Sequence, residues 1–107
     1  MKKFYHATTI EKLPIILNEG SRADLNIEGI VYLCEKPEDA AKFLLARGYK
    51  DFIVLECELD EREVVEQFDH SQSFFQCRCW GLSRNVKPNE FTMKAWQYGQ
   101  PSSLFAN

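Results

Sequence analysis

The sequence predicts an α+β domain, because two helical patterns fall in the first half of the chain and strand patterns crowd the second half. The chain has 107 residues, 45 % of them hydrophobic, which suits one core and is too few for two. Because helices and strands do not alternate regularly, we expect a mixed or mostly antiparallel sheet. One domain is predicted over residues 1–107, with residues 98–107 as a loose tail.

The first strand is expected over residues 2–6, and a helix follows it. Thr8 with an acid three residues later forms a capping-box pattern, which would begin the helix immediately. Pro14 favours a later start at residues 12–13, because proline is tolerated in the first turn and not in the interior of a helix. Gly20 is suited to end this helix.

The second strand and helix have clear local signals. Residues 29–34 are a continuous apolar run rich in β-branched side chains, typical of a buried strand. Pro37 predicts the first turn of a second helix, and Gly48 predicts its end. A third strand is expected over residues 51–59, where alternation in the second half places Glu56 on the outward face.

The pattern changes beyond the third strand. Residues 64–65 form a short apolar patch, and residues 68–71 have the polar density of a turn or a site. Two more strands are expected over residues 74–80 and 86–93, joined by residues 81–85. These strands complete the predicted α+β domain.

Composition argues against two classes of protein. The formal charge is −3 and the 13 Lys and Arg residues are scattered, whereas binding to a nucleic-acid backbone requires clustered cations. No apolar run approaches the roughly 18 residues of a membrane span. Residues 1–6 also lack the apolar core of a signal peptide. We therefore expect a cytoplasmic protein with no strong nucleic-acid-binding signal and no membrane association.

The chain has four cysteines, Cys34, Cys57, Cys77 and Cys79. Cytoplasmic cysteines remain reduced as a rule. Cys77 and Cys79 are separated by one residue, which is not the spacing of a zinc knuckle, and the other two lie singly in apolar strands. We expect free thiols and no metal site.

Three residues are candidates for chemistry, and each also has an ordinary structural interpretation. His6 ends a strand just before a helix, where a histidine is often a partly buried side chain bonded to backbone. Tyr32 lies inside an apolar strand and alone would more readily be a core residue. Asp69 lies in the polar segment, where it would serve equally well to cap a turn.

Taken together and in order, these residues stand in motifs that resemble a known superfamily. "FYHATTIEKLPIILNEG" looks like a first motif of a strand with His-x-Thr, a short helix and a glycine. "GIVYLCEKPEDAAKF" resembles a second motif, a Gly-apolar-Tyr strand before a helix that opens with acids. "QFDHSQSFF" is similar in its place to the acid-bearing segment of small bacterial members that modify rifamycin antibiotics, and "NVKPNEF" looks like the closing strand of small members. Over residues 3–91 the chain thus resembles the ADP-ribosyltransferases with a His-Tyr-acid site.

The resemblance implies a minimal fold, a split and mostly antiparallel sheet with two short helices, and an NAD cleft between its halves. NAD would be the co-substrate of a mono-ADP-ribosyltransferase acting on an unknown acceptor. His6 and Thr8 would contact a ribose hydroxyl, Tyr32 would stack on the nicotinamide ring, and Arg22 would contact the pyrophosphate. Asp69 would stabilise the cation-like ribosyl centre that forms as nicotinamide leaves.

The third catalytic position is open between Asp69, Gln76 and another acid, because the glutamate of many relatives is missing and glutamine cannot carry a negative charge. The first alternative is therefore a module that binds a nucleotide or a protein without catalysis. A second is a relative that transfers phosphate at RNA ends, which would require several clustered arginines. A third is a nucleophilic pair of His70 with Cys77 or Cys79.

Overall fold

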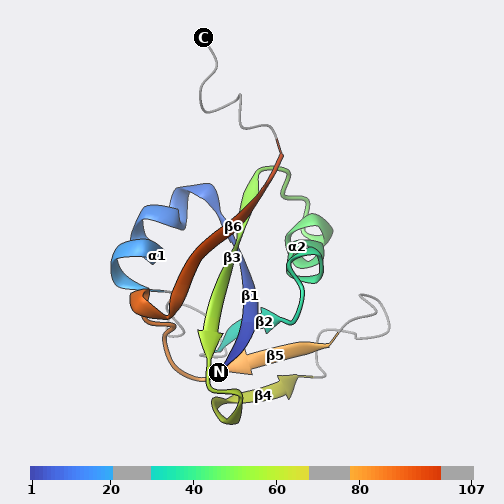
Figure 1. The fold of residues 1–107 in the computed structure, drawn as a ribbon. Helices are drawn as coiled ribbons and strands as arrows, with labels where there is room; N and C mark the ends of the chain where they lie inside the picture. The colour runs from blue at the N-terminus through green and yellow to red at the C-terminus, as the bar shows by residue number, and fades with distance from the viewer. Residues whose placement is uncertain (21–29, 68–77, 100–107) are drawn as a thin grey trace.

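The computed structural model describes residues 1–20, 30–67 and 78–99 (Figure 1). Six strands form one sheet in the order β4-β5-β2-β1-β3-β6, and every pairing in the described ranges is antiparallel. The strands are β1 Lys2–Thr9, β2 Val31–Cys34, β3 Phe52–Leu59, β4 Val64–Gln67, β5 Cys79–Leu82 and β6 Phe91–Tyr98; the helices are α1 Leu13–Glu19 and α2 Pro37–Ala46, with 3₁₀ turns at Ile10–Lys12, Glu61–Glu63 and Pro88–Glu90. The predicted α+β class, with a mostly antiparallel sheet and two short helices, is confirmed.

The sheet opens between β1 and β2. All eight residues of β1 pair with β3, whereas β1 meets β2 at one register position in the described chain, Tyr5 opposite Cys34. Two three-stranded halves result, β4-β5-β2 and β1-β3-β6. In Figure 1, β4 and β5 run across the direction of β1, β3 and β6.

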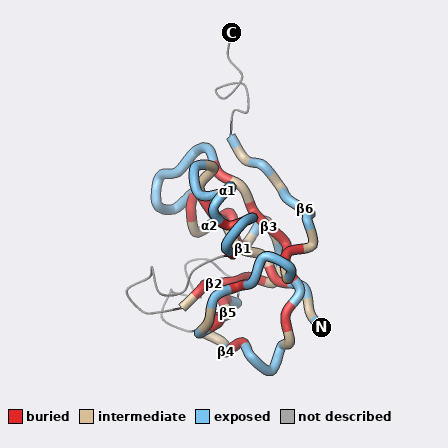
Figure 2. Tube along the Cα trace, turned by 90° about the vertical axis from the view of Figure 1, so that its left-hand side faces the viewer, coloured by how far each residue is buried: buried red, intermediate tan, exposed pale blue. Residues whose placement is uncertain are grey.

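The two helices cover opposite faces of the sheet (Figure 1). Even-numbered residues of β1 face α1, where Phe4 is fully buried in a cluster with Ile16. Odd-numbered residues face α2, whose buried side is Ala40, Ala41 and Leu44. β6 lies at the edge of the sheet and is exposed over much of its length (Figure 2). No helix in the three described ranges is long and apolar enough to span a membrane.

The first helix begins at the later of the two predicted positions. Thr8 pairs with Ile53 inside β1, so the capping-box start is wrong: pairing with β3 holds the chain extended through Thr9. α1 begins at Leu13 with Pro14 in its first turn, as the alternative start required. Long-range strand pairing therefore overrides a local capping signal.

Glu56 is buried, at 3 % exposure, which corrects its expected outward position. Its carboxylate accepts hydrogen bonds from the hydroxyl groups of Tyr5 at 2.9 Å and Thr92 at 2.7 Å. A register shift opposite Glu56, with Met93 at φ 71°, bends β6 so that Thr92 reaches the carboxylate. Burial, followed by the bond to Glu56, raises the pKa of Tyr5 to about 12.

The second half of the chain departs from the predicted boundaries. The apolar patch at 64–65 is part of strand β4, and Gly81 and Leu82 belong to β5 rather than to a connection. The last strand is β6 and not residues 86–93, because Pro88 lies in a 3₁₀ turn before it and cannot donate a ladder hydrogen bond. Residues 74–77 of the other predicted strand lie outside the described chain.

The predicted tail begins too early. Tyr98 is the last residue of β6, and its ring stacks on that of Phe52 with 5.0 Å between centroids. This contact with a fully buried side chain holds the end of β6 on the sheet. Residues 100–107 lie outside the described chain.

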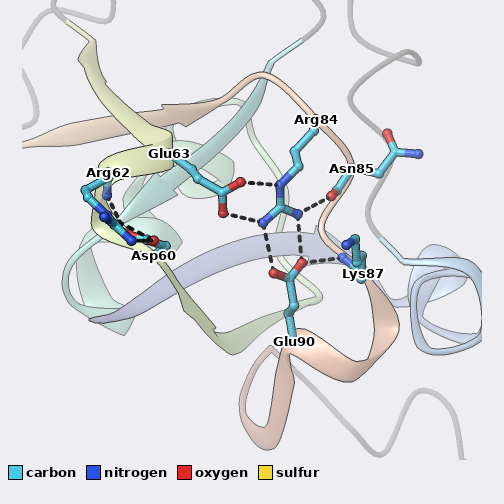
Figure 3. A network of polar contacts seen from close by, with 7 residues as sticks. All are labelled: Asp60, Arg62, Glu63, Arg84, Asn85, Lys87 and Glu90. Carbon is cyan, nitrogen blue, oxygen red and sulfur yellow. Dashed lines mark hydrogen bonds and ion pairs between the residues drawn. The ribbon is translucent and has the colours of Figure 1, made fainter. Parts of the chain in front are cut away.

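Arg84 joins the loop after β5 to two other segments (Figure 3). Its guanidinium binds the carboxylates of Glu63 and Glu90, with nitrogen–oxygen distances from 2.7 to 3.1 Å, and donates to the carbonyl of Asn85 at 2.8 Å. These hydrogen bonds hold the pKa of both carboxyl groups below their usual range. Arg62, by contrast, forms an ion pair with its near neighbour Asp60, and its side chain is 87 % exposed.

Arg84→Ala is expected to lower the free energy of unfolding at pH 7 by about 1–3 kcal/mol, because Glu90 then loses a charged partner while 15 % exposed. Both carboxyl pKa values are lowered on folding, so the contribution is present at neutral pH and is lost as the pH falls through the folded-state values. Urea unfolding at pH 7 and in acid measures this. Arg62→Ala is the control, with a smaller effect; equal losses from the two variants would contradict the role given to Arg84.

Two glycines offer a matched test of backbone constraint. Gly20 (φ 85°, ψ 173°) ends α1, and a Cβ there would overlap the carbonyl oxygen of Val86. Gly48 (φ 88°) follows α2, and a Cβ there would meet nothing within 4 Å.

Gly48→Ala should therefore cost only the left-handed backbone penalty, about 1–2 kcal/mol. Gly20→Ala should cost clearly more, because it adds the collision with Val86. Urea unfolding of the two variants measures the difference. Equal costs would show that the approach of α1 to Val86 is not a constraint on the fold.

Candidate functional site

A cavity of about 350 Å³ lies between β1 and β2, beyond the position at which these strands pair. Residues of both helices line it, and the helices lie on opposite faces of the sheet. The cavity therefore lies at the opening between the two halves of the sheet. This volume is in the range of small-molecule sites. The lining residues are Tyr5, His6, Ala7, Thr8, Thr9, Lys12, Ile15, Ile16, Gly20, Tyr32, Cys34, Ala40, Phe43, Leu44, Arg47 and Tyr49.

His6 spans the opening from β1 to β2. Its Nδ1 lies 3.0 Å from the main-chain carbonyl oxygen of Tyr32. A carbonyl can only accept, so Nδ1 carries the proton and, in the neutral ring, Nε2 is an acceptor. The side chain of His6 thus supplies a link between the strands where the backbone ladder has ended.

His6 is neutral at physiological pH. Burial, and to a smaller extent the positive charge of Lys12, lowers its pKa to about 4. An imidazole in this state binds hydroxyl groups and does not act as a cation.

Tyr32 and Thr8 also line the cavity. Thr8 is buried at 5 % exposure near the end of β1. Tyr32 stands opposite Gly81 of β5, and a Cβ on Gly81 would come within 2.8 Å of the side chains of Ile30 and Gln67. The absence of a side chain on Gly81 therefore leaves room beside Tyr32 for the neighbouring strands to approach.

Two cations lie in the cavity wall, Lys12 before α1 and Arg47 after α2. Arg47 is the C-cap of α2, which ends in a Schellman motif: Tyr49 N–H donates to the carbonyl of Leu44 and Gly48 N–H to that of Leu45, each at 3.0 Å. No Asp or Glu is among the described lining residues. The described wall is therefore suited to an anionic ligand with an aromatic part.

The structure brings together three of the residues expected to form the site, His6, Thr8 and Tyr32. Asp69 and Arg22 lie outside the described residues, as do the alternatives Gln76, His70 and Cys77. Sequence reasoning missed Lys12 and Arg47. One feature of the sequence could have pointed to Arg47, which immediately precedes the glycine expected to end the second helix. No such feature marks Lys12.

The other described arginines are bound to carboxylates. Arg62 pairs with Asp60, Arg84 with Glu63 and Glu90, and Arg78 with Glu66. None of these three arginines lines the cavity. Among the described residues, Arg47 is therefore the one guanidinium in the cavity wall, which does not favour a site for phosphate transfer that needs an arginine cluster.

Comparison with known proteins gives a fold and no activity. No protein-family model and no curated protein matches the chain. The X-ray crystal structure of protein CC0527 from Caulobacter crescentus matches it with a TM-score of 0.61 and 16 % identity, covering 99 % of this chain and 100 % of that one. The crystal structure of a double mutant of that protein matches equally well. At this identity the likeness shows a shared fold alone.

The lowered pKa of His6 predicts an acid-dependent loss of stability. The unfolded chain takes up a proton near pH 6.5, while the folded protein does so only near pH 4. The contribution of His6 to the free energy of unfolding is therefore fully present above pH 6.5. It falls by up to about 3 kcal/mol as the pH is lowered to about 4. His6→Asn keeps an N–H donor for the Tyr32 carbonyl and removes this titration, so it should lose less stability between pH 7 and 5.

Urea unfolding at the two pH values measures the effect, and NMR titration of the histidine rings measures the pKa directly. The signal that disappears in His6→Asn belongs to His6. A ring that titrates near pH 6.5 would contradict its burial in the neutral form.

Proposed function

We propose that this protein is an NAD-dependent mono-ADP-ribosyltransferase with a minimal ADP-ribosyltransferase-like fold. One observation carries the proposal: His6 and Tyr32, 26 residues apart, line a single cavity together with Thr8. The motif resemblance assigned these three residues to NAD. The opening of the sheet into two halves also agrees with the split sheet that the resemblance implies.

The cavity supports a distinct role for each described residue. The neutral ring of His6 offers Nε2 as an acceptor to a ribose hydroxyl, with the Thr8 hydroxyl nearby. The Tyr32 ring provides an aromatic face for nicotinamide. Arg47 and Lys12 supply positive charge for the pyrophosphate, a role that the motif resemblance implied for Arg22.

Catalysis requires a carboxylate to stabilise positive charge on the ribosyl carbon as the nicotinamide bond breaks. Asp69 has this role in the proposal. The alternatives for the third position are Gln76, which would fill it without a charge, and another acid. The described lining residues include no carboxylate. If no acid serves in this position, the chain is the non-catalytic binding module.

We assign the protein to the cytoplasm, where NAD is present as co-substrate. The acceptor of ADP-ribose is unknown, and it can be a protein, a nucleic acid or a small molecule.

Titration calorimetry with NAD should show binding by the wild-type protein. Tyr32→Ala and His6→Ala are expected to weaken it about tenfold or more, because each removes a direct contact, and Arg47→Ala should weaken it by loss of charge. Arg62→Ala is the matched control, because Arg62 binds Asp60 and does not line the cavity. Wild-type protein that fails to bind NAD would contradict the proposal.

Turnover separates the enzyme from the binding module. Incubation with labelled NAD and a cell lysate should transfer label, and Asp69→Asn should abolish transfer while NAD affinity is kept. Binding without release of nicotinamide or transfer of label would indicate the module. Unchanged turnover in Asp69→Asn would move the catalytic role away from Asp69.

A further inference from the structure

Two cysteines stand opposite each other across β2 and β5. Cys34 and Cys79 are register partners in this antiparallel pair and are 2 % and 3 % exposed. Directly opposed residues of antiparallel strands have Cα atoms about 4.5 or 5.5 Å apart, and a disulfide accepts about 4.4–6.8 Å. Side chains at such positions point to the same face. The backbone is therefore placed for a cross-strand disulfide, although the structure holds both cysteines in the reduced form.

The two thiols also interact. A hydrogen bond with Cys34 lowers the pKa of the Cys79 thiol. Cys57 provides the contrast, since its thiol donates to the carbonyl oxygen of Phe4 at a distance of 3.6 Å and burial raises its pKa to about 12. Of the three described cysteines, Cys34 and Cys79 form the pair suited to oxidation.

Cys34 has access to small reagents despite its burial, because it lines the cavity of about 350 Å³. Hydrogen peroxide is little larger than a water molecule and fits such a space. Cys34 also belongs to the register position that joins the two halves of the sheet, opposite Tyr5. A change in bonding at Cys34 therefore acts at the wall of the cavity and at the junction of the halves.

We propose that Cys34 and Cys79 form an oxidative modification site, at which a small hydroperoxide entering the cavity converts the two thiols to a cross-strand disulfide. The Cys34 sulfur attacks the peroxide, the O–O bond breaks, and a sulfenic acid and one water form. The Cys79 sulfur then attacks the Cys34 sulfur and displaces hydroxide, which leaves with the remaining thiol proton as a second water. Two thiols and one hydrogen peroxide thus give one disulfide and two waters.

The disulfide would join β2 covalently to β5 at a residue that lines the cavity. It also closes a long loop of chain, which stabilises the folded state at the expense of the unfolded ensemble. The oxidised protein should therefore unfold at a higher temperature than the reduced protein. This inference concerns the thiols alone and holds whether or not the cavity binds NAD.

The test uses the full chain carrying Cys77→Ser, reduced, desalted and treated with hydrogen peroxide. Intact mass should fall by two hydrogen atoms, and peptide mapping without reductant should show the Cys34 peptide joined to the Cys79 peptide. Dithiothreitol should restore the original mass and the lower unfolding temperature. A further Cys57→Ser change should leave the cross-link intact, whereas Cys79→Ser should remove it and leave Cys34 as a sulfenic acid that dimedone captures.

The peptide map of the otherwise unaltered chain decides the matter even if a serine variant folds poorly. Peroxide-treated protein in which Cys34 and Cys79 stay alkylatable would overturn the proposal. A cross-link that involves Cys57 would overturn it as well.

Discussion

The structure depends on how β1 is paired. β1 bonds to β3 along its whole length, yet meets β2 at one register position in the described chain, Tyr5 opposite Cys34. A strand that twists with one neighbour departs from the other, so the sheet opens and a cavity forms between the halves. His6 partly closes the opening by donating from Nδ1 to the Tyr32 carbonyl. The hydrogen bond that holds the two strands together thus also fixes the tautomer of the central side chain of the site.

The charges of the molecule divide between the cavity and its outer framework. Arg84, in the loop after β5, binds the carboxylates of Glu63 and Glu90. Its charge is therefore neutralised within this ion-pair network, which holds three segments of the chain together. Arg47 lies instead in the cavity wall with Lys12, near a histidine that burial keeps neutral. The described part of the cavity wall therefore carries a net positive charge, because no acidic side chain is among its described residues. Such a charge favours the binding of phosphate groups.

Local signals in the sequence were sufficient where backbone chemistry alone decides the structure. Pro14 and Pro37 lie in first turns, and Gly20 and Gly48 follow the helices they were expected to end. Such residues restrict φ or permit positive φ wherever they occur, so their effect is visible without the rest of the fold. The alternation of apolar and polar residues along β3 gave the wrong face for Glu56. Its burial depends on Thr92, a hydrogen-bonding partner that a bulge in β6, more than thirty residues away, brings to the carboxylate.

The sequence by itself determined the α+β class, the two short helices and a residue set, His6, Thr8 and Tyr32, that shares one cavity. The class and the helices follow from periodicity and turn residues, which are properties of neighbouring positions, whereas the residue set is what the motif resemblance implies. Only the tertiary structure decided the opening of the sheet, the burial of Glu56 and the approach of Cys34 to Cys79. Each of these depends on strand order and register, which bring together positions distant in the chain and leave no periodic trace in the sequence.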